Sequence, residues 1–458
     1  MSSWRKSELS DGSVRGVKRL ALRAVLCSAL LSPSLAPAET VPGSAGATDS
    51  LLAVGADGLP RVAFAAADGS VVLAARAADG TWAAQTLPGS SGAPALLGLE
   101  LGPAGAVVLL EAANGKRLTL VEQRAPGWRV RTVARAPSNG LLGLGGLTLS
   151  PGGRPYVAYA YLLQTRQSFL RLVHEDAAGR LIGEAVTRKG FPPSTELPTV
   201  APLVLPGGAV RVVEAFSGAT IEWSRTKNRR DWVGQFLYAN SLASPGGIVR
   251  AFGDPAGGTW SAWTELFPSF GESDLVLTRN LDGQHTTVLD QHAFLVALAR
   301  TPAGPEVAAD DYVDLAGART VYAGLVLDPQ GNAVELAGNL EGYAIDATGA
   351  RHYVLLDAAG VEWYRSPTPS TARVELSAPA NGATVTLSGR VTGGSGGSVE
   401  LWRETQAGAE LLTTLPLAAD GTFAFDDTPP AGPLTYRAVY RDANGLPLSS
   451  LVRSALGA

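Results

Sequence analysis

Short apolar runs separated by turns recur along most of the chain. Some runs alternate with polar residues and others are apolar throughout, as in 71–76 and 118–121. Such runs are typical of strands in sheets that are buried on one or both faces. No stretch has the spacing of a long amphipathic helix, so the pattern predicts an all-β protein.

The turns that open these units return at a nearly constant interval. A glycine-containing turn followed by an apolar run occurs at Gly58, 47 residues later at Gly105, then after another 48 and another 55 residues at Gly153 and Gly208, and again at Gly331. Periods near this length predict propeller blades of several short strands each. We expect about six four-stranded blades, within a range of five to seven, from units at 50–90, 96–134, 143–187, 197–238 and 320–365 and a degenerate stretch at 245–313.

A tryptophan stands at one fixed place in three of these units. Trp82, Trp128 and Trp232 each follow the opening glycine by 23 or 24 positions and begin a run after a turn. A large aromatic side chain at a fixed place fills the wedge between stacked sheets. We therefore interpret these three tryptophans as core residues.

The stretch 50–365 as a whole resembles secreted bacterial β-propellers, without indicating one specific family. Within it, residues 254–260 resemble the Asp-box of sialidase-type propellers, with Asp254 and Trp260 at its two ends. The match departs by one residue between the aspartate and the glycine, and the other units lack the motif. The resemblance therefore implies a propeller fold and gives little support to glycosidase activity.

A second, smaller unit is predicted at the C-terminus. Residues 366–371 are Ser-Pro-Thr-Pro-Ser-Thr, which predicts a short, stiff linker. The segment that follows resembles the opening of bacterial Ig-like domains, with Pro379 at an edge and a tight Asn-Gly turn at 381–382. For 372–458 the resemblance implies an Ig-like β-sandwich of about seven short strands, which specifies a fold rather than a function.

Residues 1–38 have the pattern of a cleaved export signal. A basic region is followed by the largely apolar stretch 20–35 and by small residues at 36–38. The apolar part is too short and too interrupted to span a membrane. We expect the mature protein to begin near Glu39 with a short flexible segment at 39–49, and to be secreted, periplasmic or on the cell surface.

Composition narrows the partners of the mature chain. The only cysteine, Cys27, lies in the signal, so neither disulfides nor thiolate metal sites are expected. After the signal 31 Lys and Arg stand against 39 Asp and Glu, a net charge of −8 that argues against nucleic acid or an anionic membrane as the main partner. We expect a monomer without a cofactor that has a protein or carbohydrate partner at the cell surface.

Few groups of polar residues indicate a catalytic or metal-binding site. Asp290 and His292 are two positions apart, so on a strand they share a face and form either an acid–base pair or a solvated polar pair. An acidic turn is a candidate calcium site, although its spacing matches no calcium-loop motif and a solvated loop is the alternative. That turn consists of Glu306, Asp310, Asp311 and Asp314.

Recognition is predicted where the repeat loses its period. Residues 238–272 form a Gly- and Pro-rich insertion that we expect to build loops over one face of the propeller, with aromatic side chains suited to sugar rings or a protein partner. The basic hairpin tip 225–230 offers charge to an anionic glycan, or is merely an exposed tip. The predicted ligand-binding residues are Trp260, Trp263, Tyr238, Arg229 and Arg230, with no catalytic and no metal-binding residues.

Two functional hypotheses follow. In the first, the protein is an exported, non-catalytic binding or scaffold protein whose propeller is a rigid platform for a protein or a glycan. In the second, the propeller is a carbohydrate-active hydrolase or lyase. Two or three carboxylates that converge with Arg or His at one end of the channel would favour the second hypothesis, whereas the carboxylates are spread evenly along the sequence.

Overall fold

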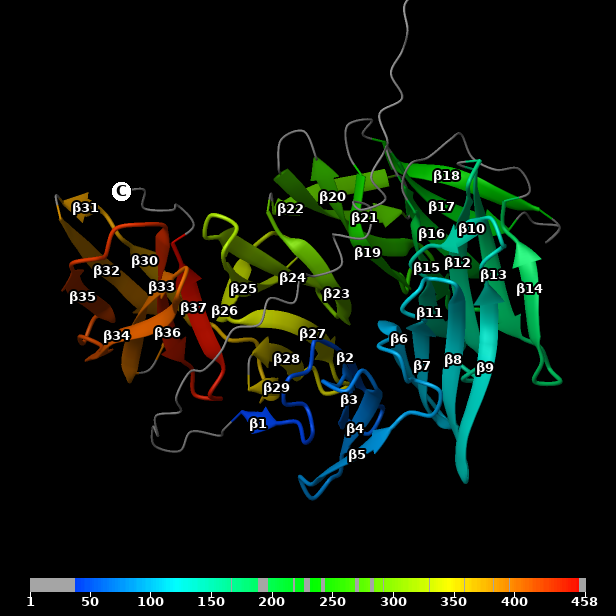
Figure 1. Cartoon of the computed structure of the whole chain (residues 1–458), viewed down its shortest axis with the longest axis horizontal. Helices are drawn as coiled ribbons and strands as arrows, with labels where there is room; N and C mark the ends of the chain where they lie inside the picture. The colour runs from blue at the N-terminus through cyan, green and yellow to red at the C-terminus, as the bar shows by residue number, and fades with distance from the viewer. Residues whose placement is uncertain are drawn as a thin grey trace, which may run out of the picture.

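A computed structural model describes residues 38–165, 167–187, 197–216, 219–225, 231–239, 244–267, 272–280, 284–290, 292–328, 330–357, 359–381, 383–394 and 396–452. Every named element in these ranges is a β-strand, which confirms the all-β prediction (Figure 1). Within the same ranges no helix is long and apolar enough to cross a membrane. The predicted export signal lies, except for its last residue, outside the described residues.

Seven antiparallel sheets of the propeller follow one another along the described chain, and we number them as blades 1 to 7. Blade 1 contains β2 (Asp49–Val54), β3 (Pro60–Ala65), β4 (Val71–Arg76) and β5 (Trp82–Thr86), and blade 2 contains β6 (Ala95–Gly102), β7 (Gly105–Glu111), β8 (Arg117–Arg124) and β9 (Gly127–Arg135). Blade 3 contains β10 (Gly140–Leu142), β11 (Gly146–Leu149), β12 (Pro155–Leu163), β13 (Ser168–Glu175) and β14 (Leu181–Ala185).

The remaining blades repeat this order. Blade 4 contains β15 (Thr199–Val204), β16 (Val210–Phe216), β17 (Ala219–Arg225) and β18 (Trp232–Ala239), and blade 5 contains β19 (Ser244–Gly253), β20 (Thr259–Phe267), β21 (Glu272–Asn280) and β22 (Gln284–Asp290). Blade 6 contains β23 (Phe294–Thr301), β24 (Gly304–Asp314), β25 (Thr320–Leu327) and β26 (Ala333–Ala337), and blade 7 contains β27 (Asn339–Ile345), β28 (Arg351–Asp357), β29 (Gly360–Ser366) and, from the other end of the chain, β1 (Glu39–Thr40).

The first strands of the blades form a closed ring. Each of β2, β6, β11, β15, β19, β23 and β27 contacts the next, and β27 returns to β2. Sheets of consecutive antiparallel strands arranged around one axis are the architecture of a β-propeller. We call the end of the ring where these first strands begin the N face and the opposite end the C face. The described strands thus form seven blades, where the sequence led us to expect about six.

A glycine with positive φ lies in the C-face turn between the first and second strand of every blade. These residues are 45 to 55 positions apart and have φ between 72° and 131°: Gly58, Gly105, Gly153, Gly208, Gly257, Gly304 and Gly349. Only glycine adopts this region freely, because it lacks a Cβ. The repeat therefore continues through 245–313, and the loop-forming insertion expected at 238–272 is corrected, because its described residues include β19 and β20 of a regular blade.

Apolar side chains fill the spaces between neighbouring blades. Blades 1 and 2, for example, share a cluster that includes Leu73 and Val108. Trp82, Trp128 and Trp232 lie at the first or second position of the fourth strands β5, β9 and β18, where they are half-buried against such clusters. The three tryptophans thus pack between blades, in agreement with their interpretation as core residues.

The N-terminal segment of the described chain is part of the last blade. Strand β1 pairs with β29, and Val41 and Ser44 just beyond it are buried. The hydroxyl of Ser44 donates to the carbonyl of Val41 at 2.7 Å and accepts from the backbone N–H of Val361 at 2.8 Å. The flexible segment expected at 39–49 is therefore corrected to a packed closing segment of blade 7.

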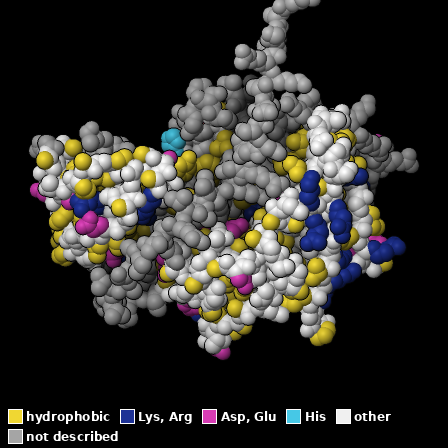
Figure 2. Space-filling model, viewed as in Figure 1, with side chains coloured by type: hydrophobic (Ala, Val, Ile, Leu, Met, Phe, Trp, Pro, Cys, Tyr) yellow, Lys and Arg dark blue, Asp and Glu magenta, His cyan; other side chains and the backbone are white. Residues whose placement is uncertain are grey.

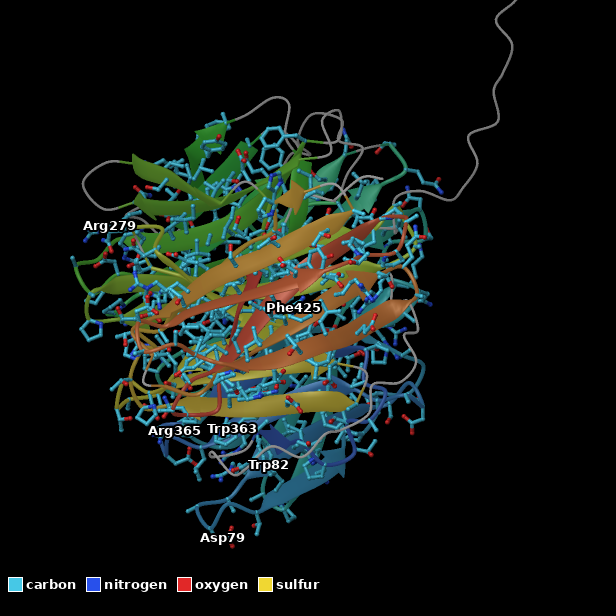
Figure 3. All side chains as sticks on the ribbon, turned by 90° about the vertical axis from the view of Figure 1, so that its left-hand side faces the viewer. Asp79, Trp82, Arg279, Trp363, Arg365 and Phe425 are labelled. Atoms are coloured by element: carbon cyan, nitrogen blue, oxygen red, sulfur yellow. The ribbon has the colours of Figure 1, made fainter. Side chains whose placement is uncertain are left out.

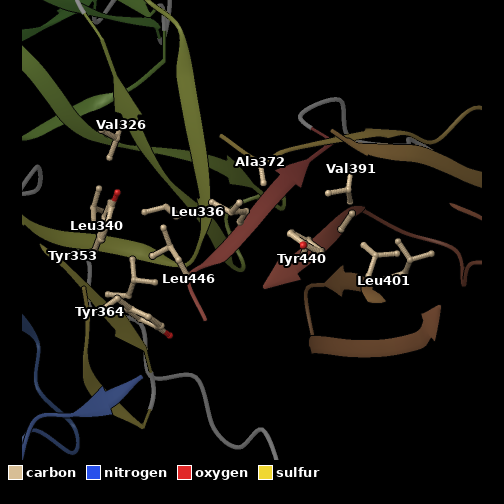
Figure 4. Close-up of a cluster of buried hydrophobic side chains, with 14 of the residues drawn as sticks. Val326, Leu336, Leu340, Tyr353, Tyr364, Ala372, Val391, Leu401, Tyr440 and Leu446 are labelled. Atoms are coloured by element: carbon tan, nitrogen blue, oxygen red, sulfur yellow. The ribbon is translucent and has the colours of Figure 1, made fainter. Parts of the chain in front are cut away.

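The C-terminal strands form two further groups. β30 (Arg373–Ser377), β31 (Ala380–Asn381), β32 (Thr384–Thr392) and β35 (Thr422–Asp427) make one sheet, whereas β33 (Ser398–Thr405), β34 (Gly408–Pro416), β36 (Leu434–Arg441) and β37 (Pro447–Leu451) continue the sheet of blade 6 through the pairing of Leu336 with Leu448. Figure 4 shows the apolar cluster running from Leu340 of the propeller past Leu446 to Tyr440. The two parts of the chain therefore share one core.

Candidate functional site

A cavity of about 240 Å³ opens on the N face between blades 1 and 2. One wall is the loop 88–94, which connects β5 to β6, and the other is the turn 112–116, which connects β7 to β8. Its lining includes the polar side chains of Ser91, Asn114, Arg117 and Thr119 and the apolar side chains of Pro94 and Leu110. We call it the blade-2 pocket.

The loop that forms the first wall is held in one shape. Ser90 is buried, and its hydroxyl donates to the carbonyl of Leu87 at 2.6 Å and accepts from the N–H of Val71 at 3.1 Å. The N–H of Ala93 donates to the carbonyl of Gly69 at 2.8 Å. Ala93 has a φ of 50°, a left-handed conformation that costs a residue with a Cβ about 1–2 kcal/mol. The surrounding hydrogen bonds thus impose a strained but defined loop.

Two arginines stand directly opposite each other beside this pocket. Arg117, on the pocket wall, pairs with Arg135 in the register between β8 and β9, and both side chains are exposed. Like charges at directly opposite positions destabilise a sheet. Among the described residues neither guanidinium has a hydrogen bond or an ion pair. Figure 2 shows Lys and Arg side chains gathered on the side of the molecule formed by blades 2 and 3.

The carboxylates of the same blade are engaged elsewhere. Glu122 of β8 is buried on the other face of the sheet, toward blade 3, where Arg131 and Arg124 pair with it at 2.5 and 3.1 Å. Glu175 of β13 also pairs with Arg131, at 2.6 Å. These ion pairs join blades 2 and 3, whereas the charges of Arg117 and Arg135 on the opposite face are unpaired among the described residues.

The aromatic residues predicted to bind a ligand do not form one site. Trp263 is only 1% exposed in the core between blades 4 and 5, where its indole N–H donates to Glu265 at 3.1 Å, so its predicted role in recognition is corrected. Tyr238 is half-buried and packs edge-on against Trp263, with 6.1 Å between ring centroids. Trp260 is half-buried near the C face under the guanidinium of Arg279, at 5.3 Å. Arg229 and Arg230 lie outside the described residues.

The other polar candidates are also dispersed. Glu306, Asp310, Asp311 and Asp314 lie along strand β24 instead of in a turn. Glu306 pairs with Arg351 at 2.5 Å, and Asp310 accepts the N–H of Leu340 at 2.6 Å. In the part of the chain that the structure describes, no three His, Cys, Asp or Glu side chains are placed to hold a metal ion. His292 is exposed, and the side chain of Asp290 lies outside the described residues.

Two carboxyl groups, that of the buried Glu214 and that of the half-buried Glu100, have strongly shifted pKa values. Burial raises the pKa of Glu214 to about 7, although the indole N–H of Trp223 donates to it at 2.9 Å and opposes the rise. Burial likewise raises the pKa of Glu100 to about 7, opposed by the charge of Arg250. Glu100 on β6 and Arg250 on β19 belong to first strands, which line the ring, and they come from blades 2 and 5.

Sequence reasoning overlooked a buried polar network near the C face of blade 7. His352 is fully buried, 3.2 Å from the carboxylate of Asp346, and the indole N–H of Trp363 lies 3.3 Å from its other ring nitrogen. Burial lowers the pKa of His352 below its ordinary value despite the carboxylate. Figure 3 shows Arg365, which also reaches Asp346, beside Trp363. The network joins the turn after β27 to β28 and β29, and its histidine is closed to solvent.

Comparison with known proteins gives no argument about function. No protein-family model and no curated protein matches the chain. Similar solved structures include the β-propeller domain of Cps50 (Swd1) from Myceliophteria thermophila, with 15% identity, 72% of this chain and 98% of that chain covered, and a TM-score of 0.45. A polysaccharide lyase described as an ulvan lyase has 10% identity, with 72% of this chain and 95% of that chain covered and a TM-score of 0.46. A fucose-binding lectin from Aleuria aurantia has 11% identity, with 72% of this chain and 96% of that chain covered and a TM-score of 0.38. Each TM-score is below 0.5, so these likenesses carry no argument about function.

Proposed function

We propose that the protein is a non-catalytic binding protein whose propeller holds a glycan in the blade-2 pocket. The observation that supports this proposal is the pocket itself, a cavity of about 240 Å³ with one wall fixed by buried hydrogen bonds. Pockets for drug-sized ligands have about 300–1,000 Å³. The smaller volume suits one saccharide unit of a longer chain.

The lining has the mixture of groups that a sugar needs. Ser91 contributes a hydroxyl, Asn114 an amide and Arg117 a guanidinium, while Leu110 and Pro94 supply apolar surface. A sugar presents hydroxyls at its edge and C–H groups on its ring faces, so a few polar groups on an apolar wall are suited to orient it. The aromatic residues predicted from the sequence are not part of this lining.

We further propose that residues 1–38 direct export and that 372–458 form an Ig-like β-sandwich that acts as a spacer or attachment module. The signal pattern supports the first proposal. The two C-terminal groups of strands, which share one apolar cluster, support the second. Export is tested by sequencing the N-terminus of protein recovered from the periplasm or the medium. An N-terminus near Glu39 is expected, and an intact N-terminus on protein confined to the cytosol would contradict the proposal.

Glycan binding is tested with protein that begins at residue 39, on a panel of neutral and acidic polysaccharides. The substitution Ser91→Trp fills the pocket from an exposed position and should weaken binding at least tenfold. Ala177→Trp, at an exposed turn on the C face, is the matched control and should leave binding and melting temperature unchanged. Equal binding by both variants, or no binding by the wild type, would overturn the proposal. Release of new reducing or unsaturated ends from a bound polysaccharide would favour the hydrolase or lyase alternative instead.

A further inference from the structure

We infer that the blade-2 pocket is selective for an anionic glycan, whose carboxylate or sulfate groups pair with Arg117 and Arg135. This inference rests on the proposed function and specifies its ligand class. Its basis is the position of two like charges that are unpaired among the described residues, namely Arg117 on the wall of the cavity and Arg135 directly opposite it in the sheet.

The placement of the two arginines is unfavourable for the protein alone. Residues directly opposite in an antiparallel pair have Cβ atoms about 4.5–5.5 Å apart, so the two side chains leave the sheet together on the same face. That face is the one directed to blade 1, since Thr119 and Val121 of the same strand line the pocket and the blade 1–2 core. A ligand with negative charge would remove the repulsion between Arg117 and Arg135, whereas a neutral ligand would leave it.

Nearby carboxylates are occupied with local structure. Asp68, in the neighbouring turn of blade 1, accepts the N–H of Ser70 at 2.9 Å and its hydroxyl at 2.7 Å. Glu111, at the end of β7, is buried. Among the described residues Arg117 and Arg135 therefore keep their positive charges unpaired.

The chemistry of arginine defines the ligand further. A guanidinium group donates two parallel hydrogen bonds to a carboxylate or a sulfate, which gives geometric selectivity as well as attraction. From Arg135 the surface continues along β9 to Thr132 and to Val130, which is 45% exposed. A hydroxyl and an apolar side chain beside two cations fit a second sugar unit of an acidic chain.

The attraction is local and does not reflect the charge of the whole protein. The chain has a formal net charge of −4, so a polyanion is repelled by the molecule as a whole. Binding of an acidic polysaccharide would therefore depend on a restricted positive surface. Removing one positive charge from that surface therefore tests the inference directly.

The test measures binding of three polymers, namely polygalacturonate, dextran sulfate and neutral dextran. The variants are Arg117→Gln, Arg135→Gln and the double variant. Arg154→Gln is the matched control, because Arg154 is also exposed and lies in a C-face turn. We expect the wild type to bind at least one acidic polymer more tightly than dextran. Each single substitution should weaken this binding about tenfold or more, because each removes a charge-assisted contact, while Arg154→Gln changes it less than twofold.

Two further readouts separate recognition from folding. Raising the salt concentration should weaken wild-type binding more than that of the double variant, because screening acts on the exposed charges. The melting temperature of Arg135→Gln should stay the same or rise, since the repulsion is removed. Preference for polygalacturonate or for dextran sulfate tells whether the recognised group is a carboxylate or a sulfate.

The possible failures are distinguishable. If Arg154→Gln weakens binding as much as Arg117→Gln, the attraction is general and the inference is overturned. If the protein binds dextran and loses it only with Ser91→Trp, the proposed function stands and anion selectivity is overturned. If no polysaccharide binds, both are overturned.

Discussion

Glu39 pairs with Trp363 across strands β1 and β29, and its carboxylate then reaches the neighbouring blade. It accepts hydrogen bonds from Nε and Nη2 of Arg76, both at 2.6 Å, and from the indole N–H of Trp82 at 2.8 Å. Trp82 in turn stands edge-on to Trp363, with 5.9 Å between ring centroids, and Figure 3 shows the two side by side. The first strand of the described chain therefore closes the ring twice, through its backbone in blade 7 and through one side chain in blade 1.

We predict that Glu39→Gln destabilises the protein by about 1–2 kcal/mol, because charge-assisted hydrogen bonds to Arg76 become neutral ones. The hydrogen bond from Arg76 is also the main reason why the pKa of Glu39 lies below 4.5 in the folded protein. A lowered pKa stabilises the folded state above the unfolded value and is lost as the pH falls through the folded one. Urea unfolding should show a clear difference between wild type and variant at pH 7 and a smaller one near pH 3. A difference that does not depend on pH would contradict the role of the carboxylate charge.

The buried carboxyl of Glu214 predicts the opposite pH dependence. Its pKa is raised from 4.5 to about 7 by burial, so the folded state holds a proton that the unfolded state releases between these values. Stability should therefore fall as the pH rises from about 4.5 to 7 and become constant above that. Glu214→Gln keeps an acceptor for Trp223 but cannot ionise, so relative to wild type it should gain on the order of 2–4 kcal/mol between pH 4 and pH 8. Urea unfolding at several pH values measures this gain, and parallel pH profiles for both proteins would refute it.

The repeat could be predicted from the sequence only in part. The turn glycines Gly58, Gly105, Gly153 and Gly208 were sufficient for a propeller, because each lies between the first two strands of a blade. Gly331 was misleading, since it lies between the third and fourth strands of blade 6 and the same backbone requirement applies there. Single residues do not reveal which turn of a blade they occupy, so blades 5 and 6 looked like one irregular stretch.

The candidate site could not be predicted from the sequence. Arg117 and Arg135 are 18 positions apart, and nothing in that spacing shows that they stand opposite each other, because a bulge between Leu118 and Thr119 shifts the register of the two strands. The sequence pattern instead predicted aromatic residues as ligand-binding residues, yet Trp263 is buried in the core between blades 4 and 5. The exposed fraction of an aromatic side chain decides whether it packs in the core or is free to bind a ligand. That fraction depends on contacts between blades that are distant in sequence.

The two tryptophans of β20 should respond differently to truncation. Trp263→Ala should cost about 3–5 kcal/mol, because it leaves a cavity between blades 4 and 5. Trp260→Ala should cost less, about 1–3 kcal/mol, because the side chain is only half-buried and loses a cation–π contact with Arg279. Chemical denaturation measures both values. A tenfold loss of polysaccharide binding by a folded Trp260→Ala protein would restore the recognition role expected from the sequence.

The C-terminal unit and blade 6 should unfold together. Besides the pairing of Leu336 with Leu448, Arg437 donates to the carbonyl of Tyr322 at 2.5 Å and the N–H of Leu451 donates to Glu335 at 2.7 Å. Leu336→Ala should cost about 2–5 kcal/mol and lower one common calorimetric transition, because Leu336 is fully buried in the shared core.

The control for this coupling is Leu387→Ala, which removes a buried side chain from the other C-terminal sheet. If the two parts are coupled, this substitution also lowers the transition of the propeller. Two separate transitions, of which Leu387→Ala moves only one, would show independent units. That result would favour the domain division at 366–371, which stays a prediction.

The loop of the blade-2 pocket gives a prediction about strain. Ala93 has a φ of 50°, a region in which a Cβ is unfavourable and glycine is not. Ala93→Gly should therefore raise the free energy of unfolding by about 0.5–1 kcal/mol, whereas alanine-to-glycine changes in ordinary backbone lower it by a similar amount. Ala84→Gly, at an exposed position of β5, is the matched control and should be destabilised. Urea unfolding of the two variants beside the wild type measures both effects. If Ala93→Gly loses as much stability as Ala84→Gly, the backbone at Ala93 is not strained, and the loop that forms the pocket wall stores no conformational energy.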